Sequence, residues 1–186
     1  MITVNRHGST PILMLFPFSG EIPLKDCRIA ARLSLGETTL QVEYRLYTNL
    51  ANLIIPVFDP SKAERKNNLW EHTCFEIFLG EGGRSNYWEF NLSPSGEWNV
   101  YAFSDYREGM KQELSFDMLP FEVNILSGQE LSLETTIDLD IIPVLSDLKT
   151  GISSVLEQKN GMKSYWALSH PGEVPDFHAR ESWIQV

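Results

Sequence analysis

The chain consists of short apolar or alternating runs separated by turn residues. The clearest case is Thr39 to Tyr47, where every second residue from Leu40 to Leu46 is apolar. A period of two is typical of a strand that buries one face. Turn signals recur along the chain, and Asn160-Gly161 is the strongest of them because that dipeptide favours a two-residue hairpin. The pattern predicts an all-β fold with mostly antiparallel strands.

Strands are expected wherever such a run is bounded by turn residues. The expected strands are Ile12–Phe16, Arg28–Leu35, Thr39–Tyr47, Leu53–Phe58, Thr73–Leu79, Tyr87–Leu92, Glu97–Phe103, Phe121–Leu126, Glu130–Leu139, Ile152–Gln158 and Lys163–Ser169. Ile141 to Leu148 fits a helical turn as an alternative, although Pro143 disfavours it. A chain of 186 residues without repeat or linker has the size of one domain. We therefore expect a single antiparallel two-sheet β-sandwich over residues 1–186.

The charge balance limits the kinds of partner. The chain has 25 acidic and 15 basic residues and a net charge of -10. Nucleic acids and anionic membranes are bound through Lys and Arg, so neither is an expected partner. A neutral or cationic ligand fits this charge better, with simple solubility as the alternative explanation.

The N-terminal apolar residues and the two cysteines bear on the cellular location of the protein and on whether its thiols are paired. No stretch is long enough to span a bilayer. Ile12 to Phe18 is too short for a signal peptide and is interrupted by Pro17. We therefore expect a cytoplasmic protein, with export as the alternative. Cys27 and Cys74 match no metal-ligand spacing and are predicted to be free thiols, or one disulfide if the protein is exported.

Three consecutive expected strands between Thr73 and Phe103 carry the most information about function. If their apolar residues face the core, alternation turns a set of polar and aromatic side chains to the other face. That set is Glu76, Tyr87, Glu89, Asn91, Asn99 and Tyr101. A first turn centred between Gly82 and Gly83 would place Glu76 opposite Glu89. A second turn centred near Ser95 would place Glu89 opposite Tyr101, and Asn91 opposite Asn99.

Two carboxylates on facing strands repel each other and destabilise a sheet. Enclosure would raise the pKa of one of them. A functional use is to accept hydrogen bonds from ligand hydroxyls, with asparagines adding donors and tyrosines stacking on sugar rings. The alternatives are a solvated sheet face, with Glu76 and Glu89 pointing into water, and acid–base chemistry by this pair as in glycosidases.

Other residues suggest metal or sugar contacts. His170, Asp176 and His178 are zinc-ligand types, but their spacing matches no known signature. Trp70 and Trp166 could sandwich a sugar ring, or instead close the end of the core. Calcium would need clustered oxygen ligands. The residues that could supply some of these are Asp59, Glu64 and Glu71.

Two parts of the sequence carry a family resemblance. One is Leu69 to Leu79 followed by Tyr87 to Trp98, and the other is Tyr165 to Pro171 followed by Pro175 to His178. Together they resemble the DOMON-like proteins related to family 9 carbohydrate-binding modules. The resemblance implies a jelly-roll-like sandwich of two antiparallel sheets that binds a sugar or haem.

The resemblance also implies roles for individual residues. Family 9 modules clamp a sugar between two tryptophans, which suggests Trp70 and Trp166 here, with Glu76 and Glu89 at the polar contacts. Haem-binding relatives use Met and His as axial ligands, for which Met110 and His170 are the available pair. Such modules are usually secreted, whereas this chain shows no good export signal, so a soluble sugar or other metabolite is the expected ligand.

The leading expectation is a non-catalytic domain that binds a carbohydrate or similar polyhydroxylated molecule. The alternatives are a sugar-active hydrolase or isomerase using Glu76 or Glu89, a protein-interaction module and a haem-binding domain. No catalytic or metal residue is assigned and no cofactor is expected, and the oligomeric state stays open. The candidate ligand-binding residues are Trp70, Glu76, Tyr87, Glu89, Asn91, Asn99, Tyr101, Trp166 and His170.

Overall fold

The computed structural model describes residues 11–18, 24–142 and 147–186. Within these residues the fold is all-β and every pair of named strands is antiparallel. The strands are β1 (Leu13–Pro17), β2 (Arg28–Leu35), β3 (Thr39–Tyr47), β4 (Cys74–Glu81), β5 (Tyr87–Leu92), β6 (Trp98–Phe103), β7 (Lys111–Gln112), β8 (Phe121–Ser127), β9 (Glu130–Asp138), β10 (Leu148–Glu157), β11 (Lys163–Ala167) and β12 (Ile184–Gln185). Short 3₁₀ helices are η1 (Leu50–Asn52), η2 (Pro60–Lys62), η3 (Leu69–Glu71) and η4 (Arg180–Ser182).

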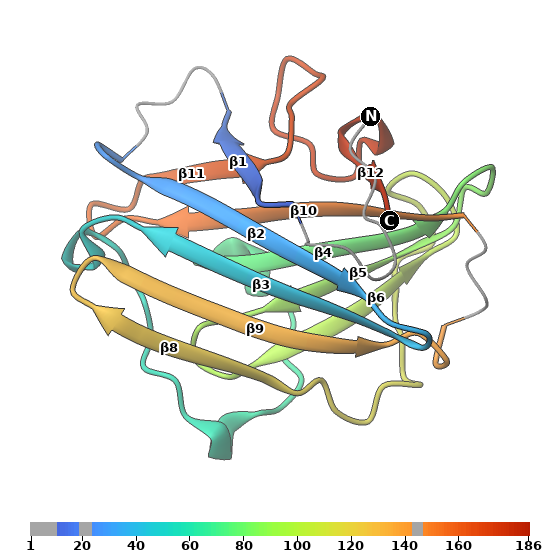
Figure 1. Ribbon diagram of the computed structural model, residues 1–186, viewed down its shortest axis with the longest axis horizontal. Coiled ribbons are helices and arrows are strands. Elements are labelled where there is room, and N and C mark those ends of the chain that lie inside the picture. The colour runs from blue at the N-terminus through green and yellow to red at the C-terminus, as the bar shows by residue number, and fades with distance from the viewer. Residues whose placement is uncertain (1–10, 19–23, 143–146) are drawn as a thin grey trace.

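The strands are hydrogen-bonded into one sheet that curls on itself. Its order is β7-β6-β5-β4-β10-β11-β1-β2-β3-β9-β8, and β12 pairs with β10. Strand β1 joins the two halves, because Leu13 to Leu15 pair with β2 while Phe16 and Pro17 pair with β11. The curl brings β2, β3, β9 and β8 in front of β4, β5 and β6 (Figure 1). The predicted all-β antiparallel fold is confirmed.

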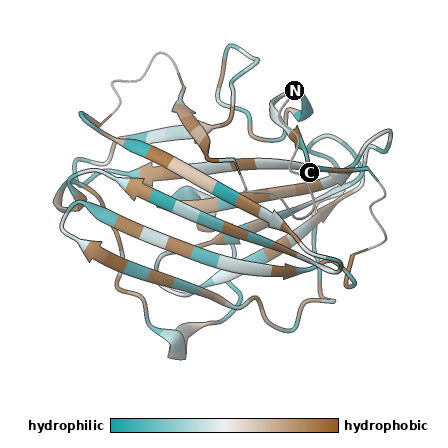
Figure 2. Ribbon diagram, viewed as in Figure 1, coloured by the Kyte–Doolittle hydropathy of each residue, from teal (hydrophilic) through white to brown (hydrophobic). Residues whose placement is uncertain are grey.

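The main core lies between the two halves of the sheet. Hydropathy alternates along β2, β3 and β9, as the period of two predicts (Figure 2). Tyr44 of β3 ties the halves together, since its hydroxyl donates to the Glu76 carbonyl at 2.7 Å and its ring lies 5.0 Å from the ring of Phe75. Burying each large apolar side chain here contributes about 1.5–3 kcal/mol.

Most expected strands are present within one or two residues of their predicted ends. The strand predicted over Leu53 to Phe58 is wrong, because Leu53 makes only an isolated bridge to Gln158. Pro56 has no N–H to donate, which disfavours pairing through this run. Strand β10 begins at Leu148, earlier than predicted. The segment with the alternative helical turn lies partly outside the described residues.

A second apolar cluster covers the opposite face of the β4–β5–β6 half. Phe78, Tyr87 and Phe103 point away from the main core and pack against Trp183 and Phe177 of the C-terminal segment. This C-terminal segment, residues 168–186, follows β11 and folds back over β4, β5 and β6, so their outer face is enclosed instead of solvated. No helix in the described part of the chain is long and apolar enough to cross a bilayer. Both cysteines are free thiols, as predicted.

Candidate functional site

The register of the three central strands is partly as predicted. Between β5 and β6, Glu89 pairs with Tyr101 and Asn91 pairs with Asn99, which confirms the second hairpin. Between β4 and β5, Glu76 pairs with Asn91 instead of Glu89. The predicted placement of the two carboxylates directly opposite each other is therefore wrong by two residues.

The shift comes from the turn between β4 and β5. Strand β4 continues to Glu81, which pairs with Leu148, so the turn is centred between Gly83 and Arg84 instead of one residue earlier. The guanidinium of Arg180 holds this turn by donating to the carbonyls of Glu81, Arg84, Ser85 and Asn86. Moving a turn centre by one residue shifts register by two and preserves the face of each side chain. Glu76 and Glu89 are thus diagonal neighbours on one face.

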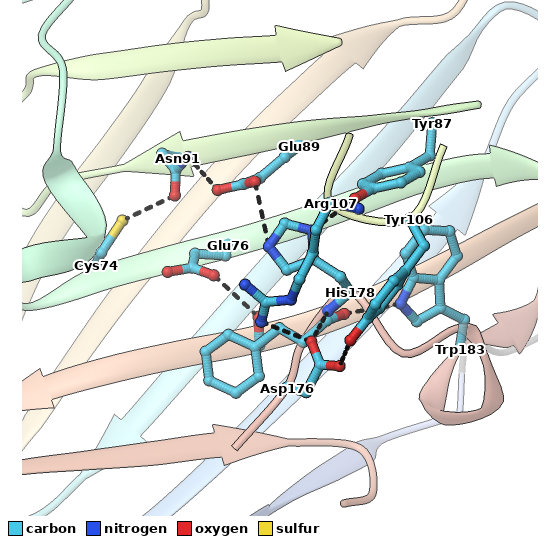
Figure 3. A network of polar contacts seen from close by, with 12 residues as sticks. Cys74, Glu76, Tyr87, Glu89, Asn91, Tyr106, Arg107, Asp176, His178 and Trp183 are labelled. Carbon is cyan, nitrogen blue, oxygen red and sulfur yellow. Dashed lines mark hydrogen bonds and ion pairs between the residues drawn. The ribbon is translucent and has the colours of Figure 1, made fainter. Parts of the chain in front are cut away.

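This face forms the floor of a cavity of about 320 Å³. The C-terminal segment and the loop after β6 form its walls, as Figure 3 shows for Arg107, Asp176 and His178. The lining residues are Trp70, Glu76, Glu89, Phe103, Arg107, Met110, Val155, Tyr165, Pro175, Phe177 and His178. Three of the predicted site residues are among them: Trp70, Glu76 and Glu89.

Glu76 is a buried carboxyl with an incomplete set of partners. Its side chain comes from β4 and the residue is only 3% exposed. Oε2 accepts a long hydrogen bond of 3.5 Å from the Ser153 hydroxyl, and buried Oε1 has no hydrogen-bond partner. Burial, and next the negative charge of Glu89, raise the pKa of Glu76 well above its ordinary value. This shift favours the protonated form of Glu76.

Glu89 lies beside it on β5 with better-defined partners. The Asn91 amide donates to Oε1 at 2.7 Å, and His178 Nε2 lies 3.8 Å from Oε2. Burial raises the pKa of Glu89 to about 7, while the Asn91 hydrogen bond and the charge of Arg107 oppose a further rise. Glu89 therefore changes its charge near neutral pH.

His178 closes the cavity from the C-terminal segment. Its ring packs edge-on against Phe78 and Phe103, and Nδ1 lies 2.7 Å from the Tyr87 hydroxyl. Burial, and next the charge of Arg107, lower the pKa of His178 to about 4. The imidazole is neutral at pH 7, so Tyr87 donates to Nδ1 and the ring N–H at Nε2 is directed to Glu89.

An ion pair at the wall links the two covering segments. Arg107 Nη2 lies 2.7 Å from Asp176 Oδ1, and the Tyr106 hydroxyl donates to the other carboxylate oxygen. Arg107 adopts a left-handed backbone conformation with φ of 54°, and its N–H donates to the Tyr87 hydroxyl. The positive charge of Arg107 is therefore compensated by Asp176.

Four other predicted residues lie around the cavity without lining it. Asn91 connects Glu89 to the Cys74 thiol, and Tyr87 stacks on Phe103 at 4.7 Å. The Asn99 amide donates to Asn67 and to the Tyr101 hydroxyl, and that hydroxyl donates to Asn67. These side chains use their polar groups within the protein, so they support the floor.

Trp166 and His170 are elsewhere. The ring of Trp166 packs in the main core, where Nε1 donates to the Ser164 hydroxyl, so its predicted role in a clamp is wrong. Alternation along β11 turns the preceding residue, Tyr165, to the cavity instead. His170 contacts the Phe16 carbonyl through Nε2 at 2.9 Å and does not line the cavity.

The residues that the sequence suggested as zinc or calcium ligands do not come together in the structure. Among the described residues no three His, Cys, Asp or Glu side chains form a metal-binding group. Asp176 pairs with Arg107 and His178 with Tyr87, while Asp59 caps η2. Of the two residues named for haem, Met110 lines the cavity and His170 does not. The zinc and calcium sets therefore have no counterpart in the described residues.

Several lining residues were not predicted as site residues. Alternation along β11 is the signal that identifies Tyr165, because it places Tyr165 and Trp166 on opposite faces of the sheet. Arg107, Met110 and Phe177 lie in irregular segments, where sequence periodicity gives no direction for a side chain. The sequence suggests His178 only as a zinc ligand and Met110 only as a haem ligand.

A larger groove of about 630 Å³ lies on the other half of the sheet, along β2, β3, β9 and β8. Its floor includes Arg32, Glu43, Glu122 and Glu134. None of its described lining residues has a buried polar atom without a partner. The smaller cavity is the better candidate because it contains such an atom.

Comparisons with known proteins give structural neighbours only. No protein-family model and no curated protein matches the chain. A Bacteroides uniformis protein, described as a candidate carbohydrate-binding protein, is 13% identical over 94% of this chain and 84% of that chain, with a TM-score of 0.63. A family 9 carbohydrate-binding module from Caldicellulosiruptor kristjanssonii with cellotriose is 15% identical over 86% and 72%, with a TM-score of 0.45. A family 9 module from the same organism in complex with glucose is 16% identical over 77% of this chain and 68% of that chain, with a TM-score of 0.39.

The likeness to the Bacteroides protein shows a shared fold. Family 9 modules are among the structural neighbours, and none of these neighbours is described as DOMON-like.

Proposed function

We propose that the chain is a non-catalytic binding domain for a carbohydrate or similar polyhydroxylated small molecule. The ligand would occupy the cavity between the β4–β5–β6 face and the C-terminal segment. We also propose that the curled sheet is a jelly-roll-like two-sheet sandwich of the DOMON and family 9 type. The shared fold with a protein described as a candidate carbohydrate-binding protein supports this reading.

The observation that carries the proposal is the buried Oε1 atom of Glu76. It has no partner within the described residues, although its side chain lines a cavity. An unsatisfied buried polar atom costs about 1–3 kcal/mol, so a fold selected only for stability disfavours it. A ligand hydroxyl or N–H would satisfy it and recover this free energy.

The walls of the cavity suit the apolar faces of a sugar ring. Trp70, Phe103, Tyr165 and Phe177 contribute aromatic surface around the two carboxyl groups. Binding sites for small molecules typically combine such apolar walls with a few polar groups that fix orientation. The cavity of about 320 Å³ lies at the lower end of the usual range and is sized for one or two sugar units.

Isothermal titration calorimetry at pH 7.5 with mono- and disaccharides tests the proposal. We expect at least one sugar to bind, and binding to weaken about tenfold in Trp70→Ala, which removes a wall, and in Glu76→Leu, which removes the acceptor. Glu37→Gln is the matched control, since Glu37 is exposed in the turn between β2 and β3. Binding by no sugar would refute the proposal. Turnover of an aryl glycoside that is lost in Glu89→Gln would replace it with an enzyme.

A further inference from the structure

The two carboxyl groups of the cavity have no cationic partner among the described residues that line it. Two carboxyl groups form its floor, and each cationic group of the wall is already paired or neutral. Arg107 is held by Asp176, and burial keeps the His178 imidazole uncharged. We infer that the ligand carries an ammonium group, as an amino sugar does, and that this group binds between Glu76 and Glu89. This inference rests on the proposed function and narrows its ligand class.

The groups facing the carboxyl pair can be named element by element. Strand β4 contributes Cys74, β5 contributes Tyr87, and β6 contributes Tyr101; each of these has a pKa that burial raises. The remaining groups near the pair are Ser153 of β10, Tyr165 of β11, Arg107 of the loop after β6, and Asp176 and His178 of the C-terminal segment. None of these supplies an uncompensated positive charge at neutral pH.

The number of donors and the charge suit an ammonium group better than a hydroxyl. An ammonium group has three N–H donors, so one group can donate to Oε1 of Glu76 and to Glu89 at once. Hydrogen bonds in which the donor or the acceptor is ionised are about twice as strong as neutral ones, and an ammonium group supplies that charge even to a protonated carboxyl group. The aromatic walls formed by Trp70, Phe103 and Phe177 would add cation–π attraction, which grows when the cation is desolvated. The net charge of -10 also attracts cations to the protein.

The two ligand classes differ in the protons that binding releases. At pH 6 Glu89 is mostly protonated, because its pKa is about 7, and the raised pKa of Glu76 favours its protonated form as well. A neutral sugar can bind to the protonated pair without releasing a proton. An ammonium group would favour ionisation of one carboxyl group, so its binding would release about one proton.

Calorimetry at pH 6.0 with glucosamine and glucose, in two buffers of different ionisation enthalpy, tests this inference. The two sugars differ only in the ammonium group at one position. We expect glucosamine to bind at least tenfold more tightly and to release about one proton per complex. Its affinity should rise nearly tenfold per pH unit between about pH 5 and 6.5, as linkage requires for one released proton.

Variants separate the carboxyl pair from the rest of the cavity. In Glu76→Gln and Glu89→Gln we expect the preference for glucosamine over glucose to fall at least fivefold, while Glu37→Gln keeps it. Far-ultraviolet circular dichroism checks that each variant is folded. If a variant does not fold, the proton release measured with the unmodified protein tests the inference instead.

The outcomes distinguish the two proposals. Glucose binding as tightly as glucosamine, without proton release, would overturn the inference and leave the proposed function standing. If neither these sugars nor other mono- and disaccharides bind between pH 5 and 8, both proposals fail.

Discussion

Replacing Glu89 with Gln should stabilise the protein increasingly as the pH rises. The pKa of Glu89 is raised from 4.5 to about 7 by burial, so the folded state holds a proton that the unfolded state has lost over this range. The stabilising effect of this bound proton is present below pH 4.5 and is lost as the pH rises through 7. Gln keeps the acceptor that the Asn91 amide uses and does not ionise. Relative to the unmodified protein, we expect Glu89→Gln to gain about 2.5 kcal/mol between pH 5 and pH 8.

Urea unfolding followed by tryptophan fluorescence at pH 5, 6, 7 and 8 measures this difference. The quantity of interest is the free energy of unfolding of Glu89→Gln minus that of the unmodified protein, which cancels the titration of groups distant from Glu89. Glu37→Gln should give a difference that hardly changes with pH, since Glu37 is exposed. If the difference for Glu89→Gln changes by less than about 0.5 kcal/mol across this range, Glu89 is not a buried, proton-binding carboxyl and the reasoning fails.

Two further changes test the segments that cover the site. Burial lowers the pKa of His178 from 6.5 to about 4. The stability that the neutral imidazole contributes is therefore present above pH 6.5 and is lost as the pH falls through 4. Between pH 7 and 4.5, the free energy of unfolding should fall by about 2 kcal/mol more in the unmodified protein than in His178→Gln, measured in the same urea assay. Equal losses would contradict this. Arg180→Ala should lower the free energy of unfolding by about 3 kcal/mol, because the carbonyls of the β4–β5 turn lose their donor. Arg180→Lys should recover only part of this loss, and a loss below about 0.5 kcal/mol in the alanine variant would show that the turn holds its shape without the guanidinium.

The two carboxyl groups illustrate how far alternation carries a prediction. Each strand turns successive side chains to opposite faces, so matching the apolar residues of β4 and β5 placed Glu76 and Glu89 on the same face without any knowledge of the fold. Their register needed the centre of a turn, which pairing with Leu148 and the hydrogen bonds from Arg180 determine. Leu148 and Arg180 both lie more than sixty positions after the centre of this turn in the chain.

The aromatic wall of the cavity also contains residues that a local sequence pattern does not predict. The resemblance to family 9 modules suggests Trp166 for the clamp, yet its place in β11 turns it into the main core and leaves Tyr165 at the cavity. Phe177 and Arg107 reach the site from irregular segments, whose side-chain directions follow no period.

The sequence by itself determined the strands, their antiparallel pairing and the face that each side chain takes, because these follow from the local geometry of the backbone and the burial of apolar residues. Only the tertiary structure decided that the carboxyl face is enclosed. That enclosure depends on the C-terminal segment packing over β4, β5 and β6, and on the ion pair between Arg107 and Asp176. Contacts between distant segments are set by the packing of the whole chain, which no local pattern records.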